Sequence, residues 1–273
     1  MLSVRSPAVA GSFYPLQTAA LTHKVKAMLG AAKAEPVSAA AIPPKAIIVP
    51  HAGYIYSGTT AALAYQRLQA WRQQIHRVVL LGPVHRVPVR GLALPGVDAF
   101  DTPLGRIPVD QAGVDILSHL KQVVTSPAAH AQEHSLEVQL PFLQMVLEHF
   151  TLLPLAVGDA TASEVAQVLD AVWGGPETLI VISSDLSHYL PYDNAQEMDR
   201  NTVNHMLQLD SHITPAQACG AAPVNGLLLA AAQHHLTPEL LGLCNSGDTA
   251  GDKGRVVGYG ALAFHEATHH DAH

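Results

Sequence analysis

Three histidines stand just beyond three short apolar runs, at the points where strands would end: His51, His85 and His188. Neutral imidazole is the commonest protein ligand of zinc, iron and copper, and it moves protons near neutral pH. Side chains at the carboxyl ends of parallel strands meet in one crevice outside the sheet. The three histidines are therefore predicted to share one site, and a metal ion is the simplest reason for sharing it.

A third, anionic ligand would complete a reactive metal site. Two histidines and one anionic side chain, with coordination positions left open, let a bound metal act on a substrate. Three residues are candidates for that ligand: Asp185, Glu133 and Cys219. Cys219 precedes a helix expected to open at Pro223, where backbone amides would favour a thiolate. The residues by themselves leave the choice among the three open.

Each of these residues also has an ordinary structural explanation. With 17 histidines in the chain, a single histidine after a strand is more often a hydrogen-bonded loop residue than a ligand. Cys219 alone would be a small buried side chain, and Asp185 would cap a turn. Tyr54 and Tyr56 would pack in the wall. What favours a shared site is that three separate predicted strands are each followed by a histidine.

The elements that would position these residues alternate between strands and helices. Continuous apolar runs predict buried strands at Ala46–Val49, Arg77–Leu81, Thr151–Val157, Thr178–Ile182 and, last, Arg255–Phe264. Amphipathic patterns predict helices at Thr59–Gln69, Ser135–Phe150, Ser163–Trp173, Asn194–Leu209 and Pro223–Gln233, with Pro141 kinking or splitting the second. This alternation predicts an α/β fold with a mostly parallel or mixed central sheet and helices on both faces.

One domain spanning residues 1–273 accounts for the whole chain, since no internal repeat and no long linker divides it. Gly91–Val109 combines alternating hydrophobicity with turn residues, which indicates a hairpin. Ala31–Pro44 is predicted to be a surface loop, and a short polar tail with several histidines covers about 266–273.

Composition narrows the classes of partner and compartment. Apolar residues make up 48% of the chain and charged residues 14%, so a sizeable core is expected. The net charge of −7 and the absence of a Lys/Arg cluster argue against nucleic acid as a partner. No apolar run approaches the roughly 18 residues that cross a bilayer, and no signal peptide is recognisable. Two cysteines form no disulfide framework, so a soluble cytoplasmic protein without membrane association is expected.

Several motifs, in order along the chain, resemble one known family. They are VRSPAVAGSFYP, PHAGYIYSG, GPVHR, FDTPLG, EHSLEVQLPFL, SSDLSHY, and Cys219-Gly220 followed by PVNGLL. From about Val4 to Phe264 the sequence is similar to the MEMO family, whose prokaryotic members are often called AmmeMemoRadiSam system protein B. Several motifs together are far more specific than any one of them.

The resemblance implies a fold like that of the class III extradiol ring-cleaving dioxygenases, which hold non-haem Fe(II) with two histidines and a glutamate. Carried onto this sequence, the two histidine ligands match His51 and His85. The acid/base histidine matches His188, and the third-ligand position matches Cys219. Thiolate in place of carboxylate makes a softer site, which favours copper(I), zinc or a thiolate-ligated iron over a plain oxygen-activating Fe(II).

The first functional hypothesis is therefore a mononuclear His/His/Cys redox site in an oxidoreductase or dioxygenase-like enzyme of unknown substrate. It would hold one transition-metal ion, with iron or copper favoured and zinc as an alternative. His188 and Asp185 are the catalytic candidates. The pocket candidates around them are Tyr54, Tyr56, Glu133 and His134.

The rival hypothesis is a non-catalytic module that binds an anionic (phospho)peptide or a partner protein in the same crevice. Backbone amides at the glycine turns, with Arg86 nearby, would receive a phosphate. The family resemblance also implies a partnership with a radical-SAM protein and an AMMECR-like protein. A serine hydrolase is disfavoured, because no G-x-S-x-G elbow is present.

Overall fold

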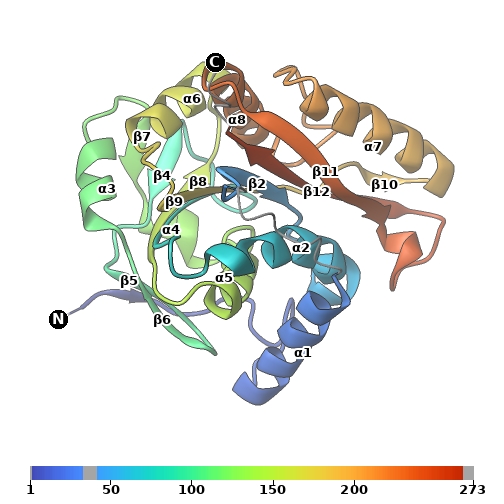
Figure 1. Cartoon of the computed structure of the whole chain (residues 1–273), viewed down its shortest axis with the longest axis horizontal. Coiled ribbons are helices and arrows are strands. Elements are labelled where there is room, and N and C mark those ends of the chain that lie inside the picture. Colours follow the sequence, from blue (N-terminus) through green and yellow to red (C-terminus); the bar gives the residue numbers. More distant parts are fainter. Residues whose placement is uncertain (1, 33–41, 267–273) are drawn as a thin grey trace, which may run out of the picture.

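A mixed nine-stranded sheet runs through the middle of the molecule (Figure 1). The computed structural model describes residues 2–32 and 42–266. Parallel neighbours form the centre of the sheet: β2 (Ala46–Val49), β9 (Thr178–Ser183), β3 (Arg77–Pro83) and β8 (Thr151–Val157). Because these strands are buried on both faces, they read as continuous apolar runs in the sequence.

Antiparallel strands complete the sheet on both sides of this parallel centre. The strand order is β10-β12-β2-β9-β3-β8-β4-β7, and β11 pairs with β12. The flanking strands are β4 (Leu92–Leu94), β7 (Val123–Thr125), β10 (His188–Leu190), β11 (Thr237–Asn245) and β12 (Val256–His265). β12 is antiparallel to β2, and β4 is antiparallel to β8. The expected mixed α/β architecture is confirmed.

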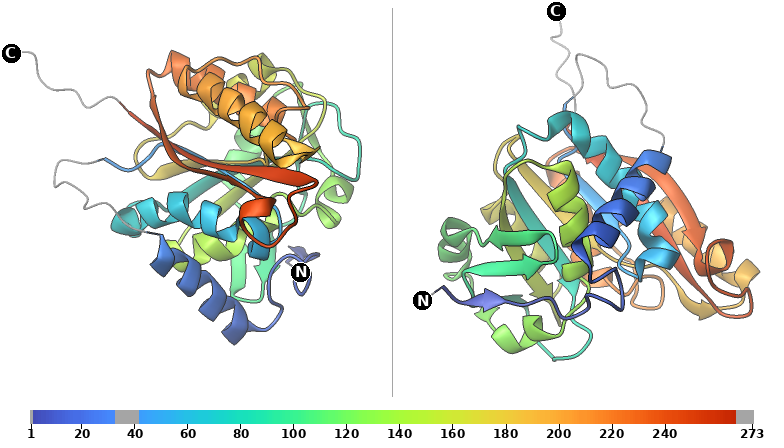
Figure 2. Two further views of the ribbon diagram at one scale, coloured as in Figure 1. Left: turned by 90° about the vertical axis from the view of Figure 1, so that its right-hand side faces the viewer. Right: turned by 90° about the horizontal axis from the view of Figure 1, so that it is seen from below.

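Helices cover both faces of the sheet (Figure 2). One face is covered by α1 (Thr18–Ala31), α2 (Tyr54–Leu68) and α5 (Leu140–Val146), and the other by α6 (Ala162–Ala171), α7 (Tyr192–Leu207) and α8 (Ala221–Gln233). Successive side chains of a strand point to opposite faces. Accordingly Ile47 and Val49 join the first hydrophobic cluster, and Ala46 and Ile48 join the second.

Short elements fill the connections. They are α3 (Gln111–Leu117), α4 (Pro127–Ala131) and the 3₁₀ turns at Gln69–Trp71, Glu137–Gln139 and Ser246–Asp248. A second small sheet joins β1 (Val4–Arg5) to the hairpin of β5 (Ala99–Thr102) and β6 (Gly105–Pro108). The hairpin expected in Gly91–Val109 is thus present, but the first part of that segment is β4 of the main sheet.

Several element boundaries differ from the sequence prediction. α2 begins at Tyr54, immediately after the glycine turn, and not at the predicted Thr59. α6 begins at Ala162, one residue before the predicted start at Ser163, and its N-cap Thr161 forms a capping box with Glu164. The single helix expected over Ser135–Phe150 is a 3₁₀ turn followed by α5, with Pro141 in the first turn of that helix. The predicted surface loop and polar tail fall largely on residues 33–41 and 267–273, which lie outside the described residues.

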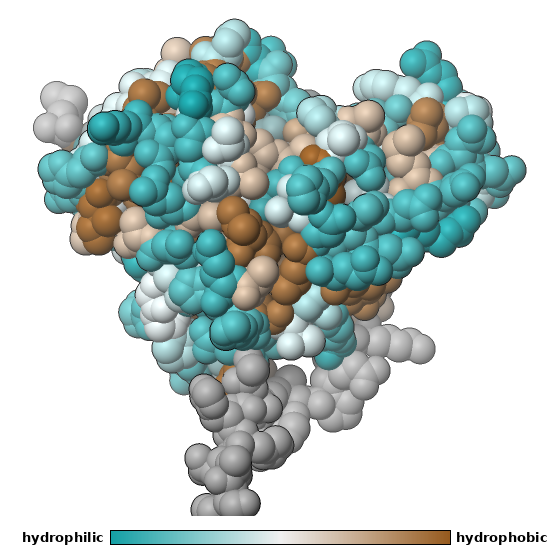
Figure 3. Space-filling view, turned by 90° about the horizontal axis from the view of Figure 1, so that it is seen from above, coloured by the Kyte–Doolittle hydropathy of each residue, from teal (hydrophilic) through white to brown (hydrophobic). Residues whose placement is uncertain are grey.

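Apolar residues gather near the centre of the face in Figure 3 and are bordered by hydrophilic ones. Large exposed apolar side chains lie on separate elements of the molecule: Leu2, Leu16, Ile55, Ile116, Val124, Tyr189 and Leu240. Such scattered exposure is normal for a globular surface. Among the described residues, no helix has the length and apolarity needed to cross a membrane.

A buried ion pair fastens the N-terminal strand to the loops around the histidines. The Arg5 guanidinium donates to Glu137 Oε2 at 2.6 Å and to the carbonyl oxygens of His130 and Glu133 at 2.8 and 2.7 Å. Glu137 also accepts from the Tyr14 hydroxyl and from the amides of residues 8 and 9. Both charged groups are therefore fully paired within the core.

Replacing Glu137 with alanine should lower the free energy of unfolding by about 3–5 kcal/mol, because Arg5 would remain buried without its carboxylate. Denaturant titration measures this loss. The control Glu239→Ala breaks the half-exposed Arg67–Glu239 pair and should cost less than about 1 kcal/mol. Equal, small losses for both variants would contradict the structural importance of the buried pair.

Candidate metal centre

Three imidazoles converge at the carboxyl edge of the parallel strands. His51 follows β2, His85 follows β3, and His134 comes from the loop after α4. One nitrogen of each ring lies within 4.8 Å of the others, a geometry that could hold a metal ion. The ring centroids are 4.5–5.3 Å apart. The sequence prediction placed His134 in the pocket wall and gave no sign that it would join the histidines.

Hydrogen bonds fix which nitrogen of His51 carries the proton. The Ser183 hydroxyl donates its single hydrogen to the carbonyl of Ser135 at 2.6 Å and accepts from Gln139 Nε2 at 2.8 Å. Its contact of 3.0 Å with His51 Nδ1 therefore needs a hydrogen on that nitrogen. Burial lowers the pKa of His51 well below its ordinary value, so the ring is neutral. Its Nε2 keeps its lone pair, which the Cys219 sulfur approaches to 3.3 Å.

A carboxylate orients His85 in the same way. Glu133 Oε1 lies 2.9 Å from His85 Nδ1, and Glu133 Oε2 accepts the backbone N–H of His85 at 2.6 Å. An ionised carboxylate only accepts, so His85 Nδ1 carries the hydrogen of this contact, and Nε2 is the nitrogen left to face the pocket. A carboxylate behind a histidine is the usual arrangement around metal ligands in proteins.

Glu133 itself is a positioning residue with its lone pairs already occupied. Its Oε1 also accepts the backbone N–H groups of His134 and Ser135, both at 2.9 Å. Burial alone would raise the pKa of Glu133, but hydrogen bonds from His85 and Ser135 outweigh it and lower the pKa to about 2. Glu133 is 2% exposed and lies behind His85, not in the pocket wall as the sequence prediction had placed it.

Cys219 lies against the first histidine. Its Sγ is 3.3 Å from His51 Nε2, close to the separation of about 3.5 Å expected for a nitrogen and a sulfur on one tetrahedral ion. The backbone N–H of Cys219 donates to the carbonyl of Asp185, and that of Gly220 donates to Ser184 Oγ. A side chain at Gly220 would approach Ser184 Cβ to 2.7 Å, so only glycine fits there.

The group of three ligating atoms within 4.8 Å of one another comprises the imidazoles and does not include Cys219. The thiol also differs from expectation in its acidity. Burial, reinforced by the nearby Asp185, raises the pKa of Cys219 to about 12, which outweighs the amides at the start of α8. The expectation of a low-pKa thiol at a helix N-terminus is therefore wrong for the metal-free protein.

Asp185 and His188 lie in the same pocket as the imidazoles. Asp185 Oδ1 accepts the backbone N–H groups of His51 and Ala52 at 2.7 and 3.3 Å. Burial raises the pKa of Asp185 to about 7. His188 Nδ1 donates to the carbonyl of Leu186 at 2.8 Å, so its Nε2 has a lone pair, and burial lowers its pKa. Asp185 can therefore exchange a proton near neutral pH, and Nε2 of His188 faces the pocket as a proton acceptor.

The pocket above these groups has a volume of about 560 Å³. Tyr56 lines it, but Tyr54 does not: Tyr54 is 4% exposed, and its hydroxyl donates to the carbonyl of Val138 in the core. Placing Tyr54 in the pocket was a wrong prediction. Tyr189 and Arg255 line the mouth, with the guanidinium 5.2 Å from the ring centre. Tyr189 has φ 61°, a backbone conformation rare for a bulky residue.

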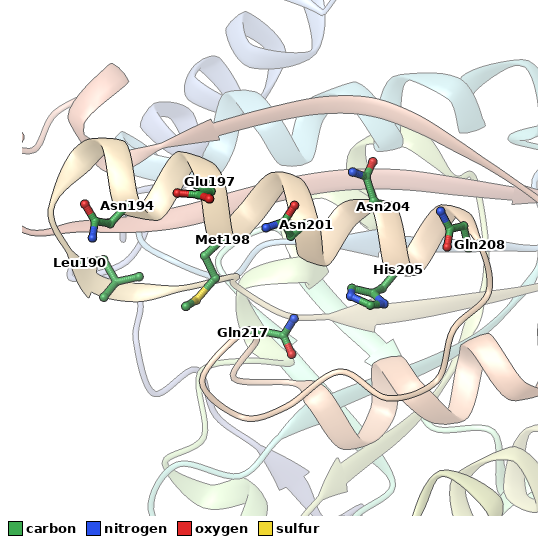
Figure 4. A pocket seen from close by; sticks show the side chains of 9 residues that line it. All are labelled: Leu190, Asn194, Glu197, Met198, Asn201, Asn204, His205, Gln208 and Gln217. Atoms are coloured by element: carbon green, nitrogen blue, oxygen red, sulfur yellow. The ribbon is translucent and has the colours of Figure 1, made fainter.

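A larger hollow, of about 650 Å³, lies along α7 and shares none of its lining residues with the histidine pocket (Figure 4). Amide side chains supply much of its lining, and Figure 4 shows those of Asn194, Asn201 and Asn204 on the helix, with Gln217 on the facing loop. This hollow lacks the set of imidazoles found at the sheet edge, so its size alone does not make it the centre of chemistry.

Comparison with known proteins gives a matching family model and relatives that align over nearly the whole chain. The family model described as Memo-like protein matches residues 5–263. A protein from Aquifex aeolicus named "MEMO1 family protein" is 36% identical over 96% of this chain and its own entire length. One of the same name from Metallosphaera sedula is 34% identical over 95% of this chain and 99% of its own length.

A solved structure shares the fold at much lower identity. It is the crystal structure of an uncharacterized protein from Escherichia coli K12, which aligns with a TM-score of 0.50 at 15% identity. The alignment covers 80% of this chain and 98% of the other. At this identity the likeness concerns the fold alone.

Replacing Glu133 with glutamine should weaken metal binding about 10- to 100-fold, because the carboxylate that holds His85 is lost. Competition with a chromophoric chelator measures the affinity, and a denaturation curve shows whether the variant is folded. The exposed Glu148 offers a matched control, and Glu148→Gln should leave the affinity unchanged. Unaltered affinity in folded Glu133→Gln would mean that the hydrogen bond to His85 does not position a ligand.

Proposed function

This chain belongs to the Memo-like protein family, and on that premise we propose that it is a metal-dependent oxidoreductase with a dioxygenase-like fold. His51, His85 and Cys219 would hold one transition-metal ion, with iron or copper favoured and zinc as an alternative. The observation that carries the proposal is the orientation of the two imidazoles. Their Nδ1–H groups are taken by Ser183 and Glu133, so Nε2 is the nitrogen of each ring that is left to bind one ion.

The choice of Cys219 as third ligand rests on its contact with His51 Nε2 and on the softness of sulfur. A thiolate with two imidazoles suits copper(I), zinc or thiolate-ligated iron. His134 is the competing third ligand, since its nitrogen belongs to the group of converging imidazoles. Burial lowers the pKa of His134 to about 4, so its ring is neutral and able to ligate or to contact a substrate.

The bound ion would supply Lewis acidity and electron transfer in the pocket. The chain's own groups would do the rest. His188 would take or give a proton at Nε2, because its Nδ1–H is fixed to the carbonyl of Leu186. Asp185 would hold the turn at His51 through two backbone N–H groups and share in proton movement. Tyr56 and Tyr189 would bound the space for a small-molecule or peptide ligand.

The rival proposal, a non-catalytic module for an anionic ligand, places the ligand in the same pocket near Arg255. Such a module needs no metal and no turnover. Screening oxygen consumption against catechols and thiols separates the two proposals, because only an enzyme with His188 as acid/base loses turnover in His188→Ala. Cooperation with radical-SAM and AMMECR-like proteins is part of the proposal by family resemblance.

Protein purified without chelator should contain about one transition-metal ion per chain, and Cys219→Ser should lose most of it. Because the thiol must lose its proton to bind, metal affinity should rise about tenfold per pH unit between pH 6 and 8. Burial has already made His51 neutral in that window, so His51 adds nothing to the slope, and the part of the slope that Cys219→Ser removes reports the thiol. Elemental analysis and chelator competition over a pH series measure both effects.

Two controls belong to this test. Cys244→Ser changes the other thiol, which contacts Thr60 Oγ1 at 3.0 Å, and should retain the metal. His188→Ala should also retain the metal, because His188 is assigned a proton and not a ligand role. A Cys219→Ser protein with full metal content and an unchanged pH slope would move the third-ligand role to His134.

A further inference from the structure

A further hollow, of about 310 Å³, lies next to the histidine pocket at the carboxyl edge of the parallel strands, beyond the ends of β3 and β8. Cys219 is partly exposed and lines this hollow, whereas it does not line the histidine pocket. The accessible surface of Cys219 therefore faces a different space from the one in which the imidazoles meet.

The partition between the two spaces is thin. Val84 lines the hollow, and the next residue, His85, lines the histidine pocket, so the chain leaving β3 forms part of the wall. Cys219 forms another part, and its Sγ is 3.3 Å from Nε2 of His51 on the pocket side. A small molecule resting on the sulfur would thus be one atom away from the imidazole ligands.

The two spaces differ in chemistry. Proline, valine and alanine side chains supply most of the lining of the hollow. Among its lining residues, all within the described part of the chain, Asp159 alone is charged, and its carboxylate is 91% exposed. The histidine pocket instead presents four imidazoles, Asp185, Asp252 and Arg255. An apolar wall offers an ion no compensation for lost water, so the hollow admits uncharged molecules and disfavours charged ones.

We propose that this hollow is a second entrance to Cys219, selective for small uncharged molecules of the size and polarity of dioxygen. Polar ligands would use the histidine pocket, so the two co-reactants of a redox centre would arrive by separate routes. The inference rests on the proposed function for the assignment of Cys219 to the metal, whereas access to the sulfur can be measured without any metal.

The test measures modification of Cys219 in metal-free protein carrying Cys244→Ser. Two thiosulfonates of similar reactivity are compared, the neutral methyl reagent and the anionic sulfonatoethyl reagent, with the adduct followed by mass spectrometry. The ratio of the two rates cancels the fraction of thiolate. Relative to the same protein unfolded in urea, that ratio should favour the neutral reagent about tenfold.

Bulk placed in the hollow should slow the reaction. Ala222 lines the hollow in the first turn of α8, and the series Ala222→Val, Leu and Phe should slow the neutral reagent progressively, to about one tenth with Phe. Tyr56→Trp adds bulk to the histidine pocket and should leave the rate unchanged. Thermal denaturation of each variant confirms that it is folded.

The opposite pattern would overturn the proposal: slowing by Tyr56→Trp but not by the Ala222 series, or a rate ratio equal to that of the unfolded chain. Failure of the proposed function has a different signature. If zinc or iron(II) added to the wild-type protein leaves the modification rate of Cys219 unchanged, the thiol is not a ligand, whatever route the reagent takes.

Discussion

The hydrogen bonds behind His51 and His85 are the interactions on which the proposed site depends. A neutral imidazole can bind a metal through either nitrogen, and only a fixed partner decides which one stays free. Ser183 fixes the tautomer of His51. Its own hydrogen is donated to the carbonyl of Ser135, so its oxygen can only accept a hydrogen from His51 Nδ1. Glu133 accepts the hydrogen of His85 Nδ1 in the same way. With both Nδ1–H groups occupied, the Nε2 atoms of His51 and His85 are the nitrogens left to bind a metal at the sheet edge.

The rest of the fold holds these partners in place. Ser183 is the last residue of β9, so its position follows from the parallel pairing of β9 with β2 and β3. Glu133 lies in a loop, and its backbone carbonyl is fixed by Arg5, which is itself paired with Glu137 in the core. A buried ion pair on the N-terminal strand thereby supports a histidine far along the chain. Positioning residues are as much a part of such a site as its ligands.

The central strands and three of the pocket histidines could be predicted from the sequence. The edge strand β11, the role of Ser183 and the acidity of Cys219 could not, and each case has a physical reason. The central strands are buried on both faces and so appear as apolar runs, which places His51, His85 and His188 at one edge. β11 does not appear as an apolar run, because many of its residues are half-exposed and it contains Pro238 and Glu239 near its start. The role of Ser183 depends on contacts with residues 44 and 48 positions away, which no local pattern reveals. The acidity of Cys219 was misjudged because burial outweighs the start of a helix.

The central claim is that one ion is shared by two imidazoles and one thiolate. X-ray absorption at the metal edge of anaerobically prepared protein tests it most directly, because sulfur and nitrogen scatter at distinguishable distances. The account predicts one sulfur at about 2.3 Å together with two imidazole nitrogens at about 2.0–2.1 Å for a zinc-like ion. A shell of nitrogen and oxygen alone, with three imidazoles and no sulfur, would contradict it and assign the third position to His134.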